Sequence, residues 1–186
     1  AAALRLTDLY AGPLQNPARA IEFARKAREL ARSDRAVAGE LGGLVHQAGD
    51  HAWAYDLLRE ATQGGEKNAS YLVNLGRAAY SLGRVDEART AMESALAAGP
   101  EPAIAAEATD FLELTAVPGA DAARIEAALA RDARHVPALF GRAAVEEKAG
   151  QAAAATATCE EILKIYPSFT PAQKQLAILL TADPAS

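Results

Sequence analysis

Two residue types are scarce in this sequence of 186 residues: it contains one cysteine, Cys159, and aromatic residues make up only 5%. A single cysteine excludes an intramolecular disulfide. The low aromatic content, with alanine at about a quarter of the positions, favours closely packed helices over a sheet-built core. We therefore expect an all-helical protein. Because Cys159 stands where an apolar residue is expected on the second helix of the fifth repeat described below, we expect it to be a buried core residue and not a reactive thiol.

The sequence also lacks a basic block and a long apolar run. Its 24 acidic and 19 basic residues give a net charge of −5 and are spread along the chain, which argues against nucleic-acid binding. No stretch of about 18 apolar residues is present, so we expect no direct insertion into a membrane. These absences indicate a soluble segment, and its compartment, cytoplasmic or periplasmic, stays open.

An internal repeat of 34 residues decides the expected architecture. Five residue pairs share that spacing: Leu41–Leu75, Gly42–Gly76, Gly49–Gly83, Ala54–Ala88 and Ala61–Ala95. Three further pairs lie 67 residues apart, so that one intervening unit is a residue shorter: Gly83–Gly150, Ala88–Ala155 and Pro100–Pro167. A fixed period of this length is typical of helical repeat proteins.

Each unit contains two amphipathic stretches with a breaker between them. In the third unit, apolar residues recur at helical spacing up to Tyr80, Gly83 interrupts the pattern, and Pro100 ends the second stretch. The expected helix N-caps are Asn16, Asp50 and Thr170. These signals predict a single domain over 1–186, with repeats at about 1–34, 35–68, 69–102, 103–135 and 136–169 and a terminal helix over 171–181.

The repeats carry a recognisable motif. The third unit reads Leu72-x₂-Leu75-Gly76-x₂-Ala79, followed by Ala88-x₃-Met92 and Pro100. This pattern resembles the W-x₂-L-G-x₂-Y…A-x₃-F…P skeleton of the tetratricopeptide repeat family, and the alanine richness suggests a bacterial type. The fourth unit departs most, with a turn at Pro118-Gly119. The resemblance implies an all-α fold: a right-handed α-solenoid of five helix-turn-helix repeats plus a C-terminal helix.

Small residues fit this arrangement physically. Gly42, Gly76 and Ala143 recur at one position of the first helix of their units. A small side chain at that position lets two helices approach each other closely.

No set of residues points to catalysis, a metal or a cofactor. The three histidines lack the motifs of a metal site or a catalytic triad, and His46 and His51 lie five residues apart across an expected turn. Gly39, Gly42 and Gly43 fall inside a helical pattern, with no strand before them and no phosphate-loop lysine after them. We therefore expect a protein that is not an enzyme and binds no cofactor.

In the tetratricopeptide family, the first helices of successive repeats line a concave groove, and an asparagine there often bonds the main chain of an extended peptide. By this resemblance, Asn74 would bond a ligand main chain, Arg77 would pair with an acidic group, and Tyr80 would give aromatic contacts. The predicted groove residues are Asn74, Arg77, Tyr80, Glu40, His46, Gln47, Phe111 and Phe140. The small Gly39 and Gly43 would leave room for the ligand.

The resemblance thus implies a scaffold whose groove binds a peptide or helix of another protein. Other functions stay open: the repeat domain of a larger enzyme, part of an envelope or polysaccharide-export protein, or a self-association module. The last of these depends on the terminal helix, whose Leu176, Leu179 and Leu180 belong to an apolar stretch that covers much of the helix circumference.

Overall fold

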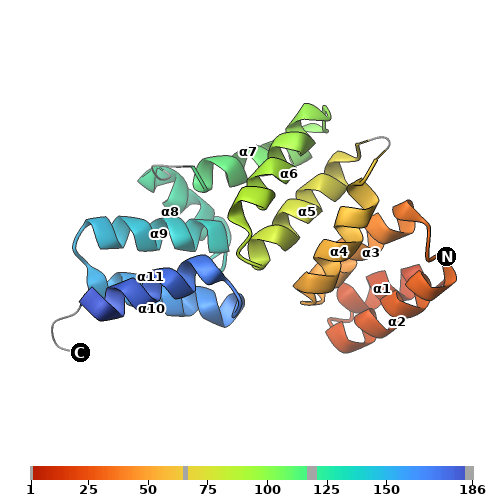
Figure 1. The fold of residues 1–186 in the computed structure, drawn as a ribbon, viewed down its shortest axis with the longest axis horizontal. Coiled ribbons are helices and arrows are strands. Elements are labelled where there is room, and N and C mark those ends of the chain that lie inside the picture. The colour runs from red at the N-terminus through yellow and green to blue at the C-terminus, as the bar shows by residue number, and fades with distance from the viewer. Residues whose placement is uncertain (1, 65–66, 117–120, 183–186) are drawn as a thin grey trace. The chain divides into compact units, whose positions relative to one another are not determined.

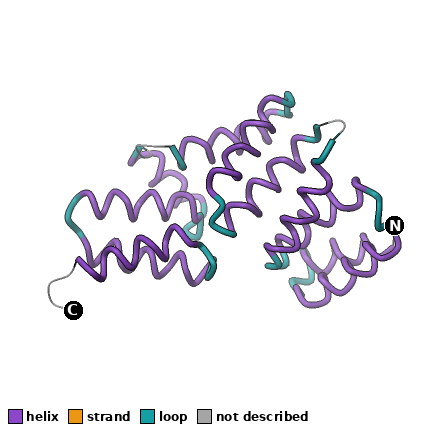
Figure 2. Tube along the Cα trace, in the orientation of Figure 1, coloured by secondary structure: helices purple, strands orange, loops and turns teal. Residues whose placement is uncertain are grey.

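The computed structural model describes residues 2–64, 67–116 and 121–182, and within them it contains eleven α-helices and no strand. The helices follow one another through short loops (Figures 1 and 2). The all-helical prediction is therefore confirmed. The turn predicted at Pro118-Gly119 lies outside the described residues.

The chain divides into two compact units, and we describe each by itself. The first unit comprises Ala1–Tyr80 and Arg84–Ala108, and the second comprises Ser81–Gly83 and Thr109–Ser186. The first unit contains α1 (Ala2–Ala11), α2 (Pro17–Leu30), α3 (Arg35–Gln47), α4 (His51–Thr62) and α6 (Val85–Ala97). It also contains α5 (Ala69–Ser81) except for its last residue, and the part of α7 (Pro102–Leu114) that ends at Ala108. The remaining helices are α8 (Ala122–Arg131), α9 (Val136–Lys148), α10 (Ala152–Ile165) and α11 (Thr170–Ala182).

Helix starts follow the predicted capping chemistry at two of three positions. The side chain of Asn16 accepts a hydrogen bond from the Arg19 amide at 3.2 Å, and that of Asp50 accepts one from the Trp53 amide at 3.1 Å. The cap predicted at Thr170 is wrong, because α11 already includes this residue. Its hydroxyl instead donates to the Ser168 carbonyl at 3.4 Å.

Glycines with a left-handed backbone recur between the paired helices. Gly49 follows α3, Gly83 follows α5 and Gly150 follows α9, with φ angles of 92°, 75° and 72°. Other residue types rarely adopt this conformation, whereas glycine adopts it at little cost. The sequence spacing of these glycines thus marks the same local event in three hairpins: the end of the first helix.

The core of the first unit is built on helices that approach each other closely. A Cβ added at Gly42 of α3 would lie 2.4 Å from Cγ of Leu58 in α4, and Leu58 is fully buried. A Cβ added at Gly76 of α5 would meet Met92 of α6 at 2.8 Å. The prediction that small residues permit close helix approach is therefore confirmed at both positions.

The second unit uses a different mixture of side chains in its core. Ala143 of α9 packs with Ala155 and Cys159 of α10 and with Leu179 of α11. Cys159 is buried, which confirms the prediction made from its position in the repeat. Leu176 also packs against this cluster. Leu179 is buried, which corrects the prediction that it offers a self-association surface, whereas Leu176 is half-buried. Leu180 and Ile178 are large apolar residues of α11 that are exposed, and self-association through this helix stays a prediction.

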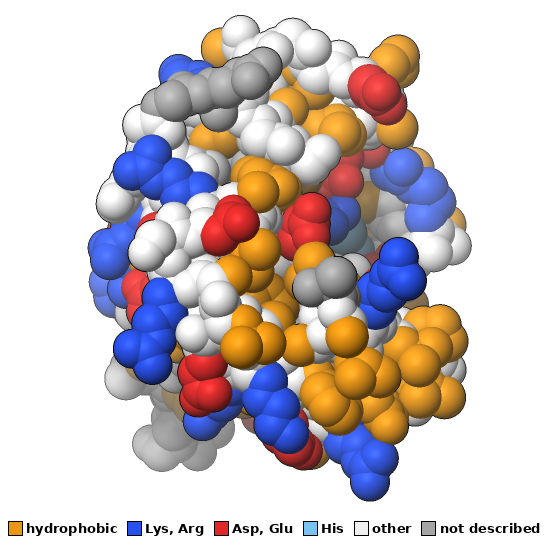
Figure 3. Space-filling view, turned by 90° about the vertical axis from the view of Figure 1, so that its right-hand side faces the viewer, with side chains coloured by type: hydrophobic (Ala, Val, Ile, Leu, Met, Phe, Trp, Pro, Cys, Tyr) orange, Lys and Arg blue, Asp and Glu red, His pale blue; other side chains and the backbone are white. Residues whose placement is uncertain are grey.

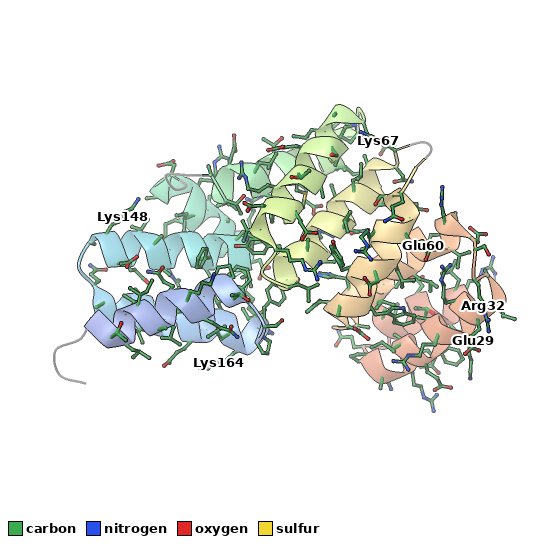
Figure 4. The ribbon with its side chains drawn as sticks, viewed as in Figure 1. Glu29, Arg32, Glu60, Lys67, Lys148 and Lys164 are labelled. Carbon is green, nitrogen blue, oxygen red and sulfur yellow. The ribbon has the colours of Figure 1, made fainter. Side chains whose placement is uncertain are left out.

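Ion pairs and exposed apolar side chains occur on the first unit. Arg28 of α2 donates to both carboxylate oxygens of Glu60, a residue of α4 labelled in Figure 4.

Leu9, Leu14 and Leu30 are exposed large hydrophobic residues of the N-terminal hairpin. Figure 3 shows hydrophobic side chains gathered on the lower part of the side where α1 and α2 lie.

Candidate partner-binding surface

Asn74 on α5 joins two of the expected groove helices. Its side-chain oxygen accepts a hydrogen bond from the Arg77 guanidinium at 3.3 Å. Its side-chain nitrogen lies 3.0 Å from the position that a Cβ of Gly43 would occupy, so the Asn74 amide rests directly on the backbone of α3. Gly43 therefore leaves room for a neighbouring side chain and not for a ligand, which corrects the prediction.

The same correction applies to Gly39, one turn earlier on α3. The ring of Tyr71 on α5 would lie 2.5 to 2.6 Å from a Cβ at this position, so the ring fills the space that glycine leaves. The Tyr71 hydroxyl donates to the carbonyl of Ala36 at 3.4 Å. Burial, followed by the charges of Glu40 and Asp34, raises the pKa of Tyr71. The phenol is therefore neutral at physiological pH and fixes α5 against α3.

Arg77 extends the same surface toward the next first helix. Its guanidinium forms an ion pair with Glu107 of α7, and both belong to the first unit. The two side chains are 47% and 38% exposed, so solvent and a partner can reach them. An ion pair with this exposure contributes little to stability, which leaves its charges available for recognition.

His46 of α3 interacts with Arg77 and is a neutral base. Its ring centre is 4.7 Å from that of His51. Burial, followed by the charges of His51 and Arg77, lowers the pKa of His46 to about 4. Polar groups from three successive first helices thus meet on one surface, which we call the α3–α5–α7 cluster: His46, Asn74, Arg77 and Glu107.

The other predicted groove residues divide by burial. Glu40 and Gln47 of α3 are exposed, and they remain candidates for contact with a partner. Tyr80 and Phe111 are only 3% and 7% exposed, so the aromatic contacts expected from them are not offered at the surface. The helical period assigned both residues to a face, but it could not tell whether that face meets solvent at these positions.

Phe140, the last predicted groove residue, belongs to the second unit. It is half-buried, and its ring meets that of Phe169 edge-on at 5.5 Å. Phe169 is fully buried. Phe140 therefore has a structural contact within its own unit, and whether it also meets a ligand stays a prediction.

Two residues of this surface were missed from the sequence: Glu107 and Tyr71. Glu107 could have been found by searching neighbouring first helices for a residue of opposite charge to Arg77. Tyr71 had a weaker signal, because only the contact itself reveals that an aromatic ring is seated on a glycine of the preceding first helix.

Chemical sites of other kinds do not emerge from the described part of the chain. It contains no group of three or more His, Cys, Asp or Glu residues that could hold a metal ion. None of its helices combines the length and hydrophobicity needed to cross a membrane. Burial raises the pKa of Cys159 to about 11, which keeps this thiol protonated and poorly nucleophilic.

Comparison with known families finds a match to part of the chain. The sequence model of the tetratricopeptide repeat matches residues 45–108, a segment that contains the whole α3–α5–α7 cluster. This match confirms, for that segment, the resemblance seen in the sequence motifs. No curated protein matches the sequence. Repeats of this family generally mediate protein–protein interaction and typically form non-catalytic scaffolds.

Proposed function

We propose that this chain, which contains tetratricopeptide repeats, is a scaffold that binds an extended peptide segment of another protein on its α3–α5–α7 cluster. The observation that carries the proposal is the meeting of Asn74, Arg77 and Glu107 from two successive first helices on one accessible surface. A helix of the partner is the alternative ligand, and the same residues would contact it.

The side-chain chemistry of the cluster suits a peptide main chain. The Asn74 amide has two donor hydrogens and two acceptor lone pairs, and its contacts within the protein leave part of this capacity unused. Such an amide can donate to a peptide carbonyl and accept from a peptide N–H at the same time. Hydrogen bonds of this kind recognise an extended backbone independently of its side chains.

The Arg77–Glu107 pair adds selectivity for charge. A ligand carboxylate that binds Arg77 must share its guanidinium with Glu107, and the two carboxylates repel each other. A ligand that presents a carboxylate to Arg77 and a donor to Glu107 satisfies both residues. We therefore expect ligands in which an acidic residue lies close to a basic or amide side chain.

Affinity capture from a lysate of the source organism, followed by calorimetry with the captured protein, tests this function. The Asn74→Ala/Arg77→Gln double variant should bind the captured protein about tenfold more weakly, the loss expected for one or two charged and neutral hydrogen bonds. The matched control is Lys164→Gln, because Lys164 is an exposed cation of α10 in the second unit (Figure 4). It should bind like the wild type.

A third variant separates recognition from simple loss of charge. Glu107→Gln removes the competitor for Arg77, so it should strengthen binding of an acidic ligand while the double variant weakens it. Equal affinity of all variants, with circular dichroism showing that each is folded, would contradict the proposal. A failure to capture any protein with the wild type would also count against it.

A further inference from the structure

A pocket of about 440 Å³ lies between α4, α5 and α6, entirely within the first unit. Its floor is apolar and consists of Leu72, Leu75 and Ala79 from α5 and Ala91 from α6. Leu75 is half-buried, whereas the other three are buried. The volume is sufficient for one large side chain of a partner, since ligand pockets start at about 300 Å³.

Two substitutions in the repeat motif account for this space. The tetratricopeptide skeleton W-x₂-L-G-x₂-Y places aromatic rings at the positions that Leu72 and Ala79 occupy in this unit. Both residues line the pocket. The pocket therefore lies where the third repeat has exchanged two large rings for smaller aliphatic side chains.

The pocket faces away from the α3–α5–α7 cluster. Leu72, Leu75 and Ala79 recur at intervals of three and four residues and share one side of α5. Asn74 and Arg77 lie on the opposite side of the same helix by the same period. A ligand in the pocket would thus leave the cluster free, and the two sites can be tested separately.

The wall of the pocket is a fixed aromatic ring. The hydroxyl of Tyr55 on α4 donates to Glu87 of α6 at 2.5 Å. The Arg84 guanidinium stands 4.4 Å from the centre of the Tyr55 ring and 3.7 Å from Glu87. The Arg59 guanidinium lies 5.6 Å from the same ring. These contacts hold the ring in place and pair Glu87, and because Tyr55 is only 6% exposed it closes one side of the pocket and offers a ligand little contact area.

The rim of the pocket is acidic, because Arg84 is paired with Glu87 and leaves the charge of Asp86 uncompensated. Arg59, also on the rim, is 3.7 Å from Asp56. Asp86 lines the pocket and is exposed, and within the described part of the chain its carboxylate forms no ion pair. A cation carried by the ligand would therefore find an uncompensated carboxylate beside the apolar floor.

We propose that this pocket is a second protein-binding site, which takes an aromatic side chain of a partner segment that also carries Lys or Arg beside that side chain. The partner's aromatic ring would fill the space over Leu75, and the neighbouring cation would pair with Asp86. The site does not depend on the function proposed for the opposite side of α5.

Titration of two synthetic peptides, followed by amide NMR spectra, tests this site. The probes are acetyl-Ala-Lys-Phe-Lys-Ala-amide and its counterpart with Glu in place of both Lys. The lysine peptide should shift the amide signals around Leu75, Tyr55 and Asp86 at millimolar concentrations, as expected for so small a ligand. The glutamate peptide should bind about tenfold more weakly, because its charges meet Asp86.

Two variants locate the binding. Leu75→Trp fills the pocket from its half-buried floor and should abolish the shifts. Asp86→Lys reverses the rim charge on an exposed side chain and should reverse the preference between the two peptides, and it provides the test if the tryptophan variant does not fold. Asn74→Ala/Arg77→Gln should bind both peptides as the wild type does.

Three results would overturn the site: no shifts with the lysine peptide, equal affinity for both peptides, or shifts centred on Asn74 and Arg77 that Asp86→Lys leaves unchanged. The last result would assign the peptide to the α3–α5–α7 cluster instead. Loss of this site would leave the proposed function intact, because the variants that test the two sites lie on opposite sides of α5.

Discussion

The two units place side chains of different size at one contact between the two helices of a hairpin. In the first unit the first helix contributes Gly42 and the second contributes Leu58, which lies on the glycine backbone. In the second unit the residues 101 positions later, Ala143 and Cys159, share a cluster. One pair combines no side chain with a large one, and the other combines two small ones. The hairpin interface therefore constrains the summed volume of the pair more tightly than either residue, as expected for a close-packed interior.

The largest loss of stability is expected from Gly42→Ala, which adds volume to the pair in the first unit. The added Cβ would lie 2.4 Å from Cγ and 2.9 Å from Cδ2 of Leu58, and Leu58 is fully buried, so the helices must separate. We expect a loss of about 2 kcal/mol in the free energy of unfolding, typical of overpacking. Urea unfolding of the purified protein measures it.

A double-mutant cycle sharpens this prediction. Gly42→Ala/Leu58→Cys recreates in the first unit the pair found in the second. The double variant should lose less stability than the sum of the two single variants, with a coupling of about 1 kcal/mol or more. Strict additivity would show that the two residues are not matched to each other, and the volume comparison would then be wrong.

The general fold could be read from the sequence because its signals are local. The recurring glycines Gly49, Gly83 and Gly150 each follow a first helix and have positive φ, and their spacing was one of the signals that predicted the hairpins. Asn16 and Asp50 cap their helices by contacts within three residues of themselves. Helix caps and helix-ending glycines depend mainly on neighbouring residues in the chain, so they can be predicted from the sequence pattern.

The candidate site could be predicted only in part, because it depends on contacts between helices. The period correctly separated Asn74 and Arg77 from the core side of α5, but it could not show that the Tyr71 ring fills the space beside Gly39. For the same reason Tyr80 and Phe111 were assigned to the surface although both are buried. The partner of Arg77, Glu107, lies on a different helix and 30 residues away in the sequence.

The units should also differ in their response to pH. In the first unit, the pKa of His46 is lowered from 6.5 to about 4, so the unfolded chain binds a proton more readily than the folded one between these values. Its contribution to stability is complete above about pH 6.5 and is lost as the pH falls toward 4. We expect a loss of roughly 2 kcal/mol that is absent from His46→Gln, measured by thermal unfolding across this range.

The second unit should show the opposite sign at alkaline pH. The pKa of Cys159 is raised from 9.0 to about 11, so above pH 9 the unfolded chain releases its thiol proton first and stability falls as the pH rises toward 11. Comparison of the wild type with Cys159→Ala isolates this contribution. An alkaline loss that is the same in both proteins would assign the effect to other titrating groups.

The smallest effect is expected at Gly141, a helical glycine of the second unit. A Cβ there would meet Cδ1 of Ile125 at 3.1 Å and Cγ1 at 3.3 Å, and the nearest backbone atom is the Leu114 carbonyl oxygen at 3.9 Å. The close atoms belong to a side chain that can shift by a few tenths of an ångström, whereas alanine in a helix interior is favoured over glycine by up to about 1 kcal/mol. Gly141→Ala should therefore stabilise the protein by about 0.5 kcal/mol. A loss comparable to that of Gly42→Ala would mean that α8 and α9 pack as tightly as α3 and α4, and the contrast between the two units would not extend beyond the pair at 143 and 159.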